Sequence, residues 1–190
     1  MVITKERWQE AQAAEKGFHK YSLEEGLKIY GFSYENNFRY CEIPKDLEGK
    51  TIVEVGCAGF PALYFRENYK WGVIVEPIYT STLNTICKQR NLEWIMAPVE
   101  EIDLPESDEI WLFNVMQHII DPELFIEKCK AATKTIRYFE PINYPTCLYH
   151  PHSFTMGDFK RWFVEPKLYN DYVPHFHDSE CAYGIWKASI

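Results

Sequence analysis

Short apolar runs alternate with helix-forming segments through the middle of this chain, and the alternation limits the folds open to it. The runs occupy residues 51–55, 71–75, 92–97, 108–113 and 133–139. Strands that alternate with helices form βαβ units, so the pattern predicts a parallel sheet with helices on both faces. The runs are almost continuously apolar, which is typical of strands covered on both sides.

The remaining segments complete a Rossmann-like, doubly wound α/β fold. The sequence predicts a mostly parallel sheet of seven strands, preceded by an N-terminal helical segment. Residues 22–25 read Ser-Leu-Glu-Glu, a capping-box pattern that starts a helix. Helices are expected at 4–19, 22–31, 62–69, 80–90, 122–132 and 153–163, and late strands at 167–172 and 181–187.

Charge and composition disfavour several classes of protein. The chain has 20 Lys and Arg against 28 Asp and Glu, a net charge of −8, and no basic patch, which argues against a nucleic-acid partner. A small anionic substrate held by one or two Arg stays open. No run of about 20 apolar residues predicts a membrane span, and charged residues near the start argue against a secretory signal. The six scattered cysteines contain no C-x-x-C pair, so we expect reduced thiols and a cytoplasmic protein.

The segment after the first apolar run carries the most chemical information. It reads IVEVGCAGFP over residues 52–61. Gly56 can adopt a positive φ and let a ligand approach the backbone, and a following helix would offer free N–H groups. Glu76 ends the second run, where an acid accepts hydrogen bonds from ribose hydroxyls. The alternative is that Gly56 and Gly59 mark a tight turn and Glu76 is a solvated strand end.

In these motifs the chain resembles the class I S-adenosylmethionine-dependent methyltransferases. IVEVGCAGFP is similar to their glycine loop, GVIVEP to their acidic second strand, and TIRYFEPI to their fifth strand. APVEEIDLPESDEIWLFNVMQHIIDPELF is similar to the run from their adenine loop past the fourth strand. The resemblance covers residues 48–145. One departure is that Ala58 and Phe60 replace the second and third glycines in an ungapped alignment; with one residue missing, Gly59 is the last glycine.

The resemblance implies a role for each matching position, with S-adenosylmethionine as cofactor and S-adenosylhomocysteine as product. Glu54, Gly56 and the backbone of Cys57, Ala58 and Gly59 would line the amino-acid and ribose parts. Glu76 would bind the ribose hydroxyls, and Pro77 or Ile78 would flank the adenine. Val99 and Glu100 would meet the adenine edge, and the backbone of Asn114 and Val115 would face the methionine amine.

Histidines supply the candidates for contact with the acceptor. His118 follows the fourth strand, and His150 and His152 follow the fifth. Each has a role either in the acceptor pocket, for instance as a general base, or in bonding the backbone. A second pair, His175 and His177, lies with Asp178 and Cys181, and such clusters can hold a metal. Their spacing fits no known metal site, so we assign no metal ligands.

These observations predict a single methyltransferase domain over residues 1–190. Residues 1–48 form a helical lead-in that either folds over the cofactor as a lid, with Trp8, Phe18, His19 and Tyr21 facing it, or simply packs on the sheet. Residues 49–145 bind the cofactor, and 146–190 lie on the acceptor side. The expected reaction moves a methyl group to O or N of a small molecule, with a sugar-related acceptor as one option. The alternatives are a non-catalytic S-adenosylmethionine-binding protein, a metal-dependent enzyme using the C-terminal histidines and, third, a dehydrogenase.

Overall fold

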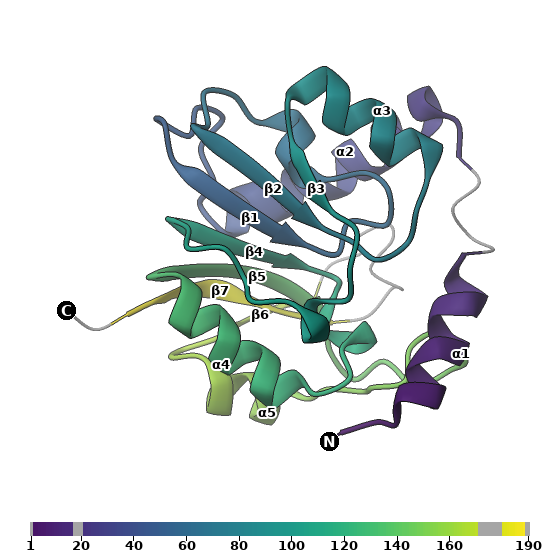
Figure 1. Cartoon of the computed structure of the whole chain (residues 1–190). Helices are drawn as coiled ribbons and strands as arrows, with labels where there is room; N and C mark the ends of the chain where they lie inside the picture. The colour runs from purple at the N-terminus through teal and green to yellow at the C-terminus, as the bar shows by residue number, and fades with distance from the viewer. Residues whose placement is uncertain (1, 17–20, 171–179, 189–190) are drawn as a thin grey trace.

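The computed structural model describes residues 2–16, 21–170 and 180–188, and a seven-stranded sheet forms its centre (Figure 1). The strand order is β3-β2-β1-β4-β5-β7-β6. Neighbours from β3 to β5 pair in parallel, whereas β7 pairs antiparallel with both β5 and β6. The predicted mostly parallel sheet is therefore confirmed. The strands are β1 (Thr51–Val55), β2 (Trp71–Val75), β3 (Glu93–Ile95), β4 (Glu109–Phe113), β5 (Thr135–Pro141), β6 (Lys167–Tyr169) and β7 (Cys181–Lys187).

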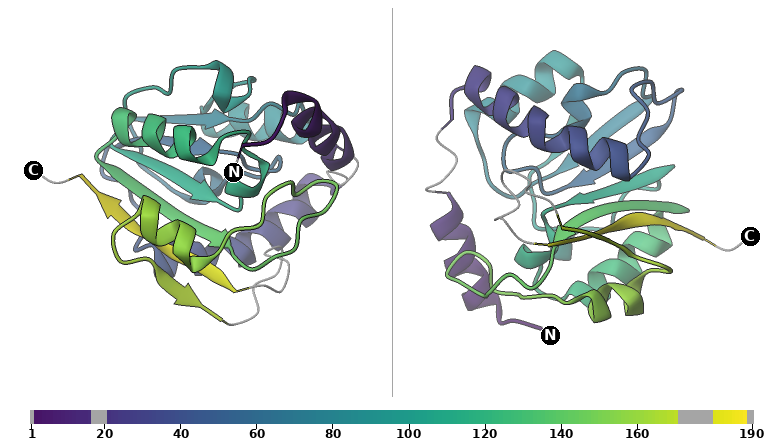
Figure 2. Two further views of the ribbon diagram at one scale, coloured as in Figure 1. Left: turned by 90° about the horizontal axis from the view of Figure 1, so that it is seen from below. Right: turned by 180° about the vertical axis from the view of Figure 1, so that it is seen from behind.

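Helices cover both faces of the sheet, as the sequence predicts (Figures 1 and 2). One face packs against α2 (Leu23–Tyr40) and α3 (Ser81–Arg90), and the other against α4 (Pro122–Ala132) and α5 (Met156–Trp162). Successive strand residues point to opposite faces, so Ile52 belongs to the first core and Val53 to the second. Both layers are therefore built from alternate positions of the same strands.

The first helix, α1 (Lys5–Glu15), lies apart from these layers, near the carboxyl ends of the central strands (Figure 2). The Thr4 side chain caps it by accepting from the N–H of Arg7 at 3.2 Å. Its Trp8 indole donates to the carbonyl of His118 at 2.9 Å. The Arg7 guanidinium donates to the carbonyls of Cys147 and Leu148 at 2.6 and 2.7 Å. Side chains thus fix α1 to two loops that follow the strands.

The expected helix over residues 62–69 is wrong. Only a four-residue 3-10 helix, η1 (Ala62–Phe65), follows β1. The chain then extends, because residues 67 and 68 hydrogen-bond with the segment before β1. The N–H of Leu47 donates to the carbonyl of Glu67 at 2.9 Å, and the N–H of Gly49 to that of Asn68 at 2.7 Å. Backbone pairing with a distant segment therefore overrides the local helix pattern.

The second helix is longer than the expected range of 22–31. The capping box at Ser22 and Glu25 starts it as predicted, but it continues to Tyr40. Gly31, where the sequence pattern ended, lies inside it. A Cβ on Gly31 would be 2.9 Å from the ring of Phe65, so the glycine serves close packing against η1 instead of ending the helix.

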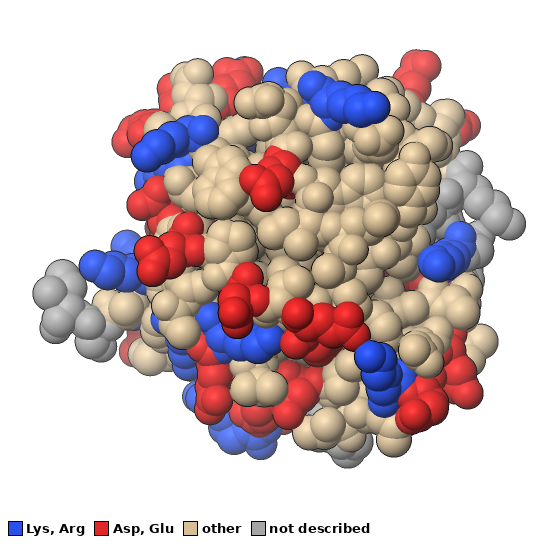
Figure 3. Space-filling model, in the orientation of Figure 1, with Lys and Arg blue, Asp and Glu red and all other residues tan. Residues whose placement is uncertain are grey.

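The surface charges are mixed on the face in Figure 3, where Lys and Arg side chains lie singly among Asp and Glu. Within the described part of the chain, every helix is too short or too polar to cross a bilayer.

Candidate functional site

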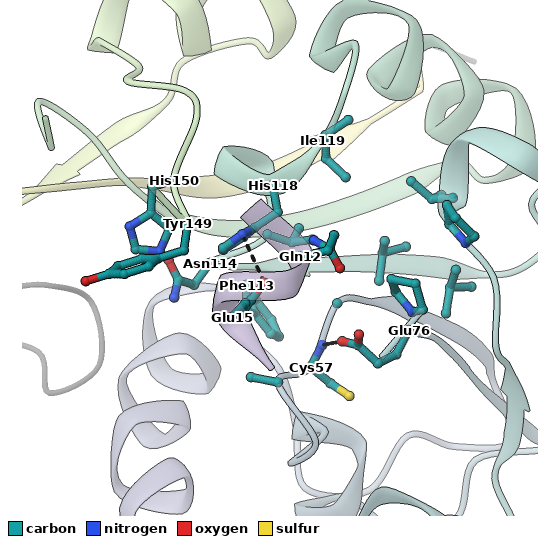
Figure 4. A pocket seen from close by; sticks show the side chains of 18 of the residues that line it. Gln12, Glu15, Cys57, Glu76, Phe113, Asn114, His118, Ile119, Tyr149 and His150 are labelled. Atoms are coloured by element: carbon teal, nitrogen blue, oxygen red, sulfur yellow. Dashed lines mark hydrogen bonds and ion pairs between the residues drawn. The ribbon is translucent and has the colours of Figure 1, made fainter. Parts of the chain in front are cut away.

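A cavity of about 440 Å³ opens at the carboxyl ends of β1, β2 and β4 (Figure 4). This is where open α/β sheets bind ligands, and the volume is within the usual range for small-molecule sites. Its lining comes from α1, α2, the loops after β1, β2, β3 and β4, and the segment 144–150. Elements far apart in the sequence therefore meet around one space.

The loop after β1 has a left-handed backbone at three positions. Gly56, Ala58 and Gly59 have φ of 66°, 48° and 84°. A Cβ on Gly56 would be 2.4 Å from Val115 Cγ2, so a larger residue there would displace the loop after β4. Gly56, Ala58 and Cys57 line the cavity, whereas Gly59 does not. A Cβ on Gly59 would instead face the Thr80 hydroxyl at 3.2 Å.

Glu76, directly after β2, lines the cavity and is 6% exposed. One carboxyl oxygen accepts from the N–H of Cys57 at 3.1 Å and the other from that of Ile78 at 2.9 Å. Burial raises the pKa of Glu76 to about 7, and these two N–H groups oppose the rise. Pro77 also lines the cavity, but Ile78 is buried outside it.

Glu54 does not line the cavity, contrary to the role that the resemblance implies. Its carboxyl group is fully buried within β1, and its oxygens accept from the N–H groups of Ala62 and Leu63 at 2.7 and 2.9 Å. It therefore caps η1 from inside the protein. Burial raises its pKa to about 8. These N–H groups are the ones that we expected to be free for a ligand.

The loop after β4 is hydrogen-bonded to a buried carboxyl group of β5. Glu140, in β5, is fully buried and accepts from the N–H of Val115 at 3.0 Å and from that of Met116 at 3.2 Å. Burial raises its pKa to about 8. Asn114, at φ 58°, and Val115 both line the cavity. Glu140 directly follows the apolar run at residues 133–139, a position where the sequence pattern places residues near the ligand site.

Val99 and Glu100 lie in the short 3-10 helix η2 (Val99–Glu101), and both line the cavity. Glu100 also accepts from the N–H of Ile120 at 2.7 Å. This bond joins the loop after β3 to the loop after β4. The two loops therefore form one continuous rim.

His118, in the 3-10 helix η3 (Met116–His118), faces the cavity and the end of α1. Its Nδ1 lies 3.3 Å from a carboxylate oxygen of Glu15, the last residue of α1 (Figure 4). Burial lowers the pKa of His118 to about 4, so its imidazole is neutral at pH 7. The ring of His150, also in the lining, meets it edge-on with 4.9 Å between centroids.

The structure corrects the acceptor-pocket role considered for His152, because this residue does not line the cavity. It is 2% exposed, its Nε2 lies 2.6 Å from the carbonyl of Ile119, and its ring stacks on Phe154. Of these two neighbouring histidines, His150 therefore lines the cavity and His152 lies in the core. His175, His177 and Asp178 lie outside the described residues. Among the described residues, no three His, Cys, Asp or Glu side chains gather as a metal site would require.

Residues from both N-terminal helices close the cavity. Trp8 and Tyr21 line it, as the lid interpretation requires, whereas Phe18 and His19 lie outside the described residues. The sequence missed further lining side chains. Tyr30, Ser33 and Tyr34 were missed because α2 was not expected to reach the glycine loop. Others among them are Gln12, Glu15, Phe113, Ile119, Tyr144 and Tyr149.

Comparison with known proteins finds no matching family model. (S)-tetrahydroprotoberberine N-methyltransferase of Eschscholzia californica is 22% identical over 163 residues, which is 77% of this chain and 47% of that protein. Probable (S)-tetrahydroprotoberberine N-methyltransferase 2 of Papaver bracteatum is 31% identical over 99 residues, 47% of this chain and 27% of that protein. The chain thus spans less than half the length of these curated relatives.

Solved structures with the same fold were also found. N-methyltransferase NodS from Bradyrhizobium japonicum WM9, in complex with S-adenosyl-l-homocysteine, has a TM-score of 0.59 at 11% identity and covers 88% of this chain and 87% of its own. The [4+2]-cyclase SpnF has a TM-score of 0.58 at 10% identity, covering 75% and 60%. The sheet order, the N-terminal helices and these neighbours show that the chain has the fold of the class I S-adenosylmethionine-dependent methyltransferases.

Proposed function

We propose that this protein is an S-adenosylmethionine-dependent methyltransferase that transfers a methyl group to O or N of a small-molecule acceptor. The observation that carries the proposal is Glu76, a buried acid at the end of β2 that two backbone N–H groups hold against the cavity. A carboxylate so placed beside the Gly56 turn accepts hydrogen bonds from a ribose diol. The names of the two curated relatives favour nitrogen as the methylated atom.

The cofactor fits along the carboxyl ends of β1, β2, β3 and β4. Glu76 and Pro77 would hold the ribose and adenine, with Val99 and Glu100 at the adenine edge. The glycine loop, where Gly56 leaves room that a Cβ would fill, would hold the amino-acid part with the Asn114 and Val115 backbone. Glu54, Gly59, Ile78 and His152 have no place in this arrangement, because none of them lines the cavity.

Bound S-adenosylmethionine supplies the methyl group as an electrophilic carbon on a sulfonium. The protein's main task is then to align the acceptor with that carbon and exclude water. Trp8 and Tyr21 close the cavity at the N-terminal helices, and His118 and His150 face it near the ends of β4 and β5. A neutral imidazole at His118 can accept a hydrogen bond or a proton from the acceptor.

Thermal melts with S-adenosylmethionine, S-adenosylhomocysteine and NAD in parallel test the cofactor. A ligand at 100 times its Kd adds about 2.7 kcal/mol, which raises the Tm of a chain of this size by several degrees. We expect a shift with both sulfur compounds, none with NAD, and loss of the shift in Glu76→Ala. Glu127→Ala, an exposed change on α4, is the control. If neither S-adenosylmethionine nor S-adenosylhomocysteine raises the Tm, the proposal is wrong.

A non-catalytic S-adenosylmethionine-binding protein is the second candidate, and the glycine loop favours it. Ala58 and Phe60 stand where the family has glycines, and Ala58 has a positive φ. Such a protein would show the melting shift but no release of S-adenosylhomocysteine with any acceptor. Turnover with an acceptor would decide for the enzyme.

We further propose that α1 acts as a lid. Arg7 and Trp8 fasten it to the carbonyls of Cys147, Leu148 and His118. Arg7→Ala removes two of these bonds, so we expect faster proteolysis within α1 and a weaker affinity for S-adenosylhomocysteine. An unchanged affinity would show that α1 only packs at this edge.

A further inference from the structure

The described lining of the cavity is acidic. It includes Glu15, Glu76 and Glu100, and no Lys or Arg. A concave site lined by one sign of charge, with apolar walls, concentrates ligands of the opposite sign. This lining therefore disfavours an acceptor that carries a phosphate or carboxylate, which the sequence alone left open.

The walls of the cavity are aromatic. Their rings can hold a flat apolar body, and tyrosine and tryptophan faces attract cations, most strongly where water is excluded. The described aromatic residues of the lining are Trp8, Tyr21, Tyr30, Tyr34, Phe113, Tyr144 and Tyr149. Charge and wall chemistry point to the same ligand, a cation with an apolar or aromatic body.

The three acids are placed differently. Both oxygens of Glu76 accept backbone N–H groups, and an oxygen of Glu100 accepts from Ile120. Glu15 instead faces a titratable side chain, His118, and comes from the lid helix. In Figure 4 it lies in the middle of the site, with Glu76 to one side and Tyr149 and His150 to the other.

The contact between Glu15 and His118 suits a cationic donor. The His118 imidazole hydrogen-bonds the backbone of Tyr149, and this bond raises its pKa, as bonding to a carbonyl does. Nδ1 makes no hydrogen bond among the described residues, so we assign the one N–H of the neutral imidazole to Nε2 and leave Nδ1 as an acceptor. Nδ1 and the Glu15 carboxylate oxygen, 3.3 Å apart, are then two acceptors side by side. A ligand with several N–H groups and a positive charge can donate hydrogen bonds to His118 Nδ1 and to the Glu15 carboxylate together.

We propose that the methyl acceptor is an amine with an aromatic or apolar body that binds in its protonated form, and that Glu15 of α1 recognises its ammonium group beside His118. The ammonium passes one proton to the Glu15 carboxylate or the His118 imidazole, and the neutral nitrogen then takes the methyl group as the sulfonium carbon–sulfur bond breaks. The inference rests on the proposed function and deepens it, since it names the acceptor class and the residue that selects it. The same helix that closes the cavity then supplies the selecting charge, so closure and recognition occur together.

Isothermal titration of the protein saturated with S-adenosylhomocysteine tests this at pH 7. The probes are phenethylamine, 2-phenylethanol and phenylacetate, which share a ring and differ in charge. We expect the amine to bind at least about tenfold more tightly than the alcohol, as a charge-assisted hydrogen bond implies, and the acid to bind most weakly. Glu15→Gln should remove the preference and leave the affinity for S-adenosylhomocysteine within about twofold. Glu10→Gln, exposed on the same helix, should keep the preference.

Three results would overturn the inference alone. The first is a protein that binds S-adenosylhomocysteine but binds the amine no more tightly than the alcohol, or binds none of the three probes. The second is a preference for the amine that survives Glu15→Gln. The third is a Glu15→Gln protein that no longer binds S-adenosylhomocysteine, which would assign Glu15 to the cofactor. Failure of the unmodified protein to bind S-adenosylhomocysteine would overturn the proposed function as well, so the two failures are distinguishable.

Discussion

The ring of Phe60 lies where a side chain on Gly26 would stand: a Cβ on Gly26 would be 1.9 Å from the ring's Cζ. The ring stacks on Tyr30 with 4.9 Å between centroids, and the Tyr34 hydroxyl donates to the Phe60 carbonyl at 2.9 Å. A glycine inside α2 thus accommodates the bulky residue that replaces a glycine of the family's loop. One contact therefore explains both a glycine inside a helix, Gly26, and a bulky residue in the glycine loop, Phe60.

Gly26→Ala should destabilise the protein, although alanine is the better helix former by about 1 kcal/mol. Overpacking against Phe60 costs roughly 1–3 kcal/mol and outweighs that gain. Adding Phe60→Leu should recover part of the loss. Urea unfolding of both single variants and the double variant measures the coupling; strictly additive changes would contradict the contact.

Binding of S-adenosylhomocysteine should weaken as the pH falls below about 7. Ribose hydroxyls bind the ionised carboxylate of Glu76, whose pKa burial raises to about 7. Below that pH the group must lose a proton on binding, so affinity falls by up to about tenfold per pH unit. Titrations at pH 6, 7 and 8 measure the slope. Glu76→Gln should bind more weakly with little slope, and an equally steep slope in that variant would assign the proton to another group.

Folding stability should carry a contribution from Glu140 that decreases between about pH 5 and pH 8. Burial raises its pKa from 4.5 to about 8. In that window the folded protein holds a proton that the unfolded chain has released, so stability falls as the pH rises. Glu140→Gln should show a shallower decrease in unfolding free energy than the unmodified protein. Parallel slopes would indicate that Glu140 is ionised in both states.

His152→Ala should lower stability without touching the ligand. The side chain is buried, bonds the carbonyl of Ile119 and stacks on Phe154, so its loss leaves a cavity and an unpaired carbonyl worth about 2–4 kcal/mol. The affinity for S-adenosylhomocysteine, measured well below the Tm, should change by less than about twofold. His150→Ala, on the cavity side, is the comparison. A large loss of affinity in His152→Ala alone would reverse the assignment.

The sequence predicts the sheet well because its strands are buried on both faces and therefore leave a continuous apolar pattern. Gly56 and Glu76 were also identifiable, since each follows a strand at the edge where ligands bind. Glu15 was not, because its place beside His118 depends on how α1 docks across a loop about a hundred residues later. The role expected for Glu54 was wrong because the sequence does not show which way its side chain points. In the structure its carboxyl group turns inward to the N–H groups of Ala62 and Leu63.

The inward turn of Glu54 also bears on which adenosine compounds the cavity can accept. Phosphate-bearing cofactors rest their oxygens on N–H groups like those at the start of η1, but here a carboxyl group inside the protein holds them. A nucleotide entering the site would find the Glu76 carboxyl group and no cationic side chain in the described lining. ATP and NAD would therefore compete poorly for the cavity even though their adenosine half would fit it.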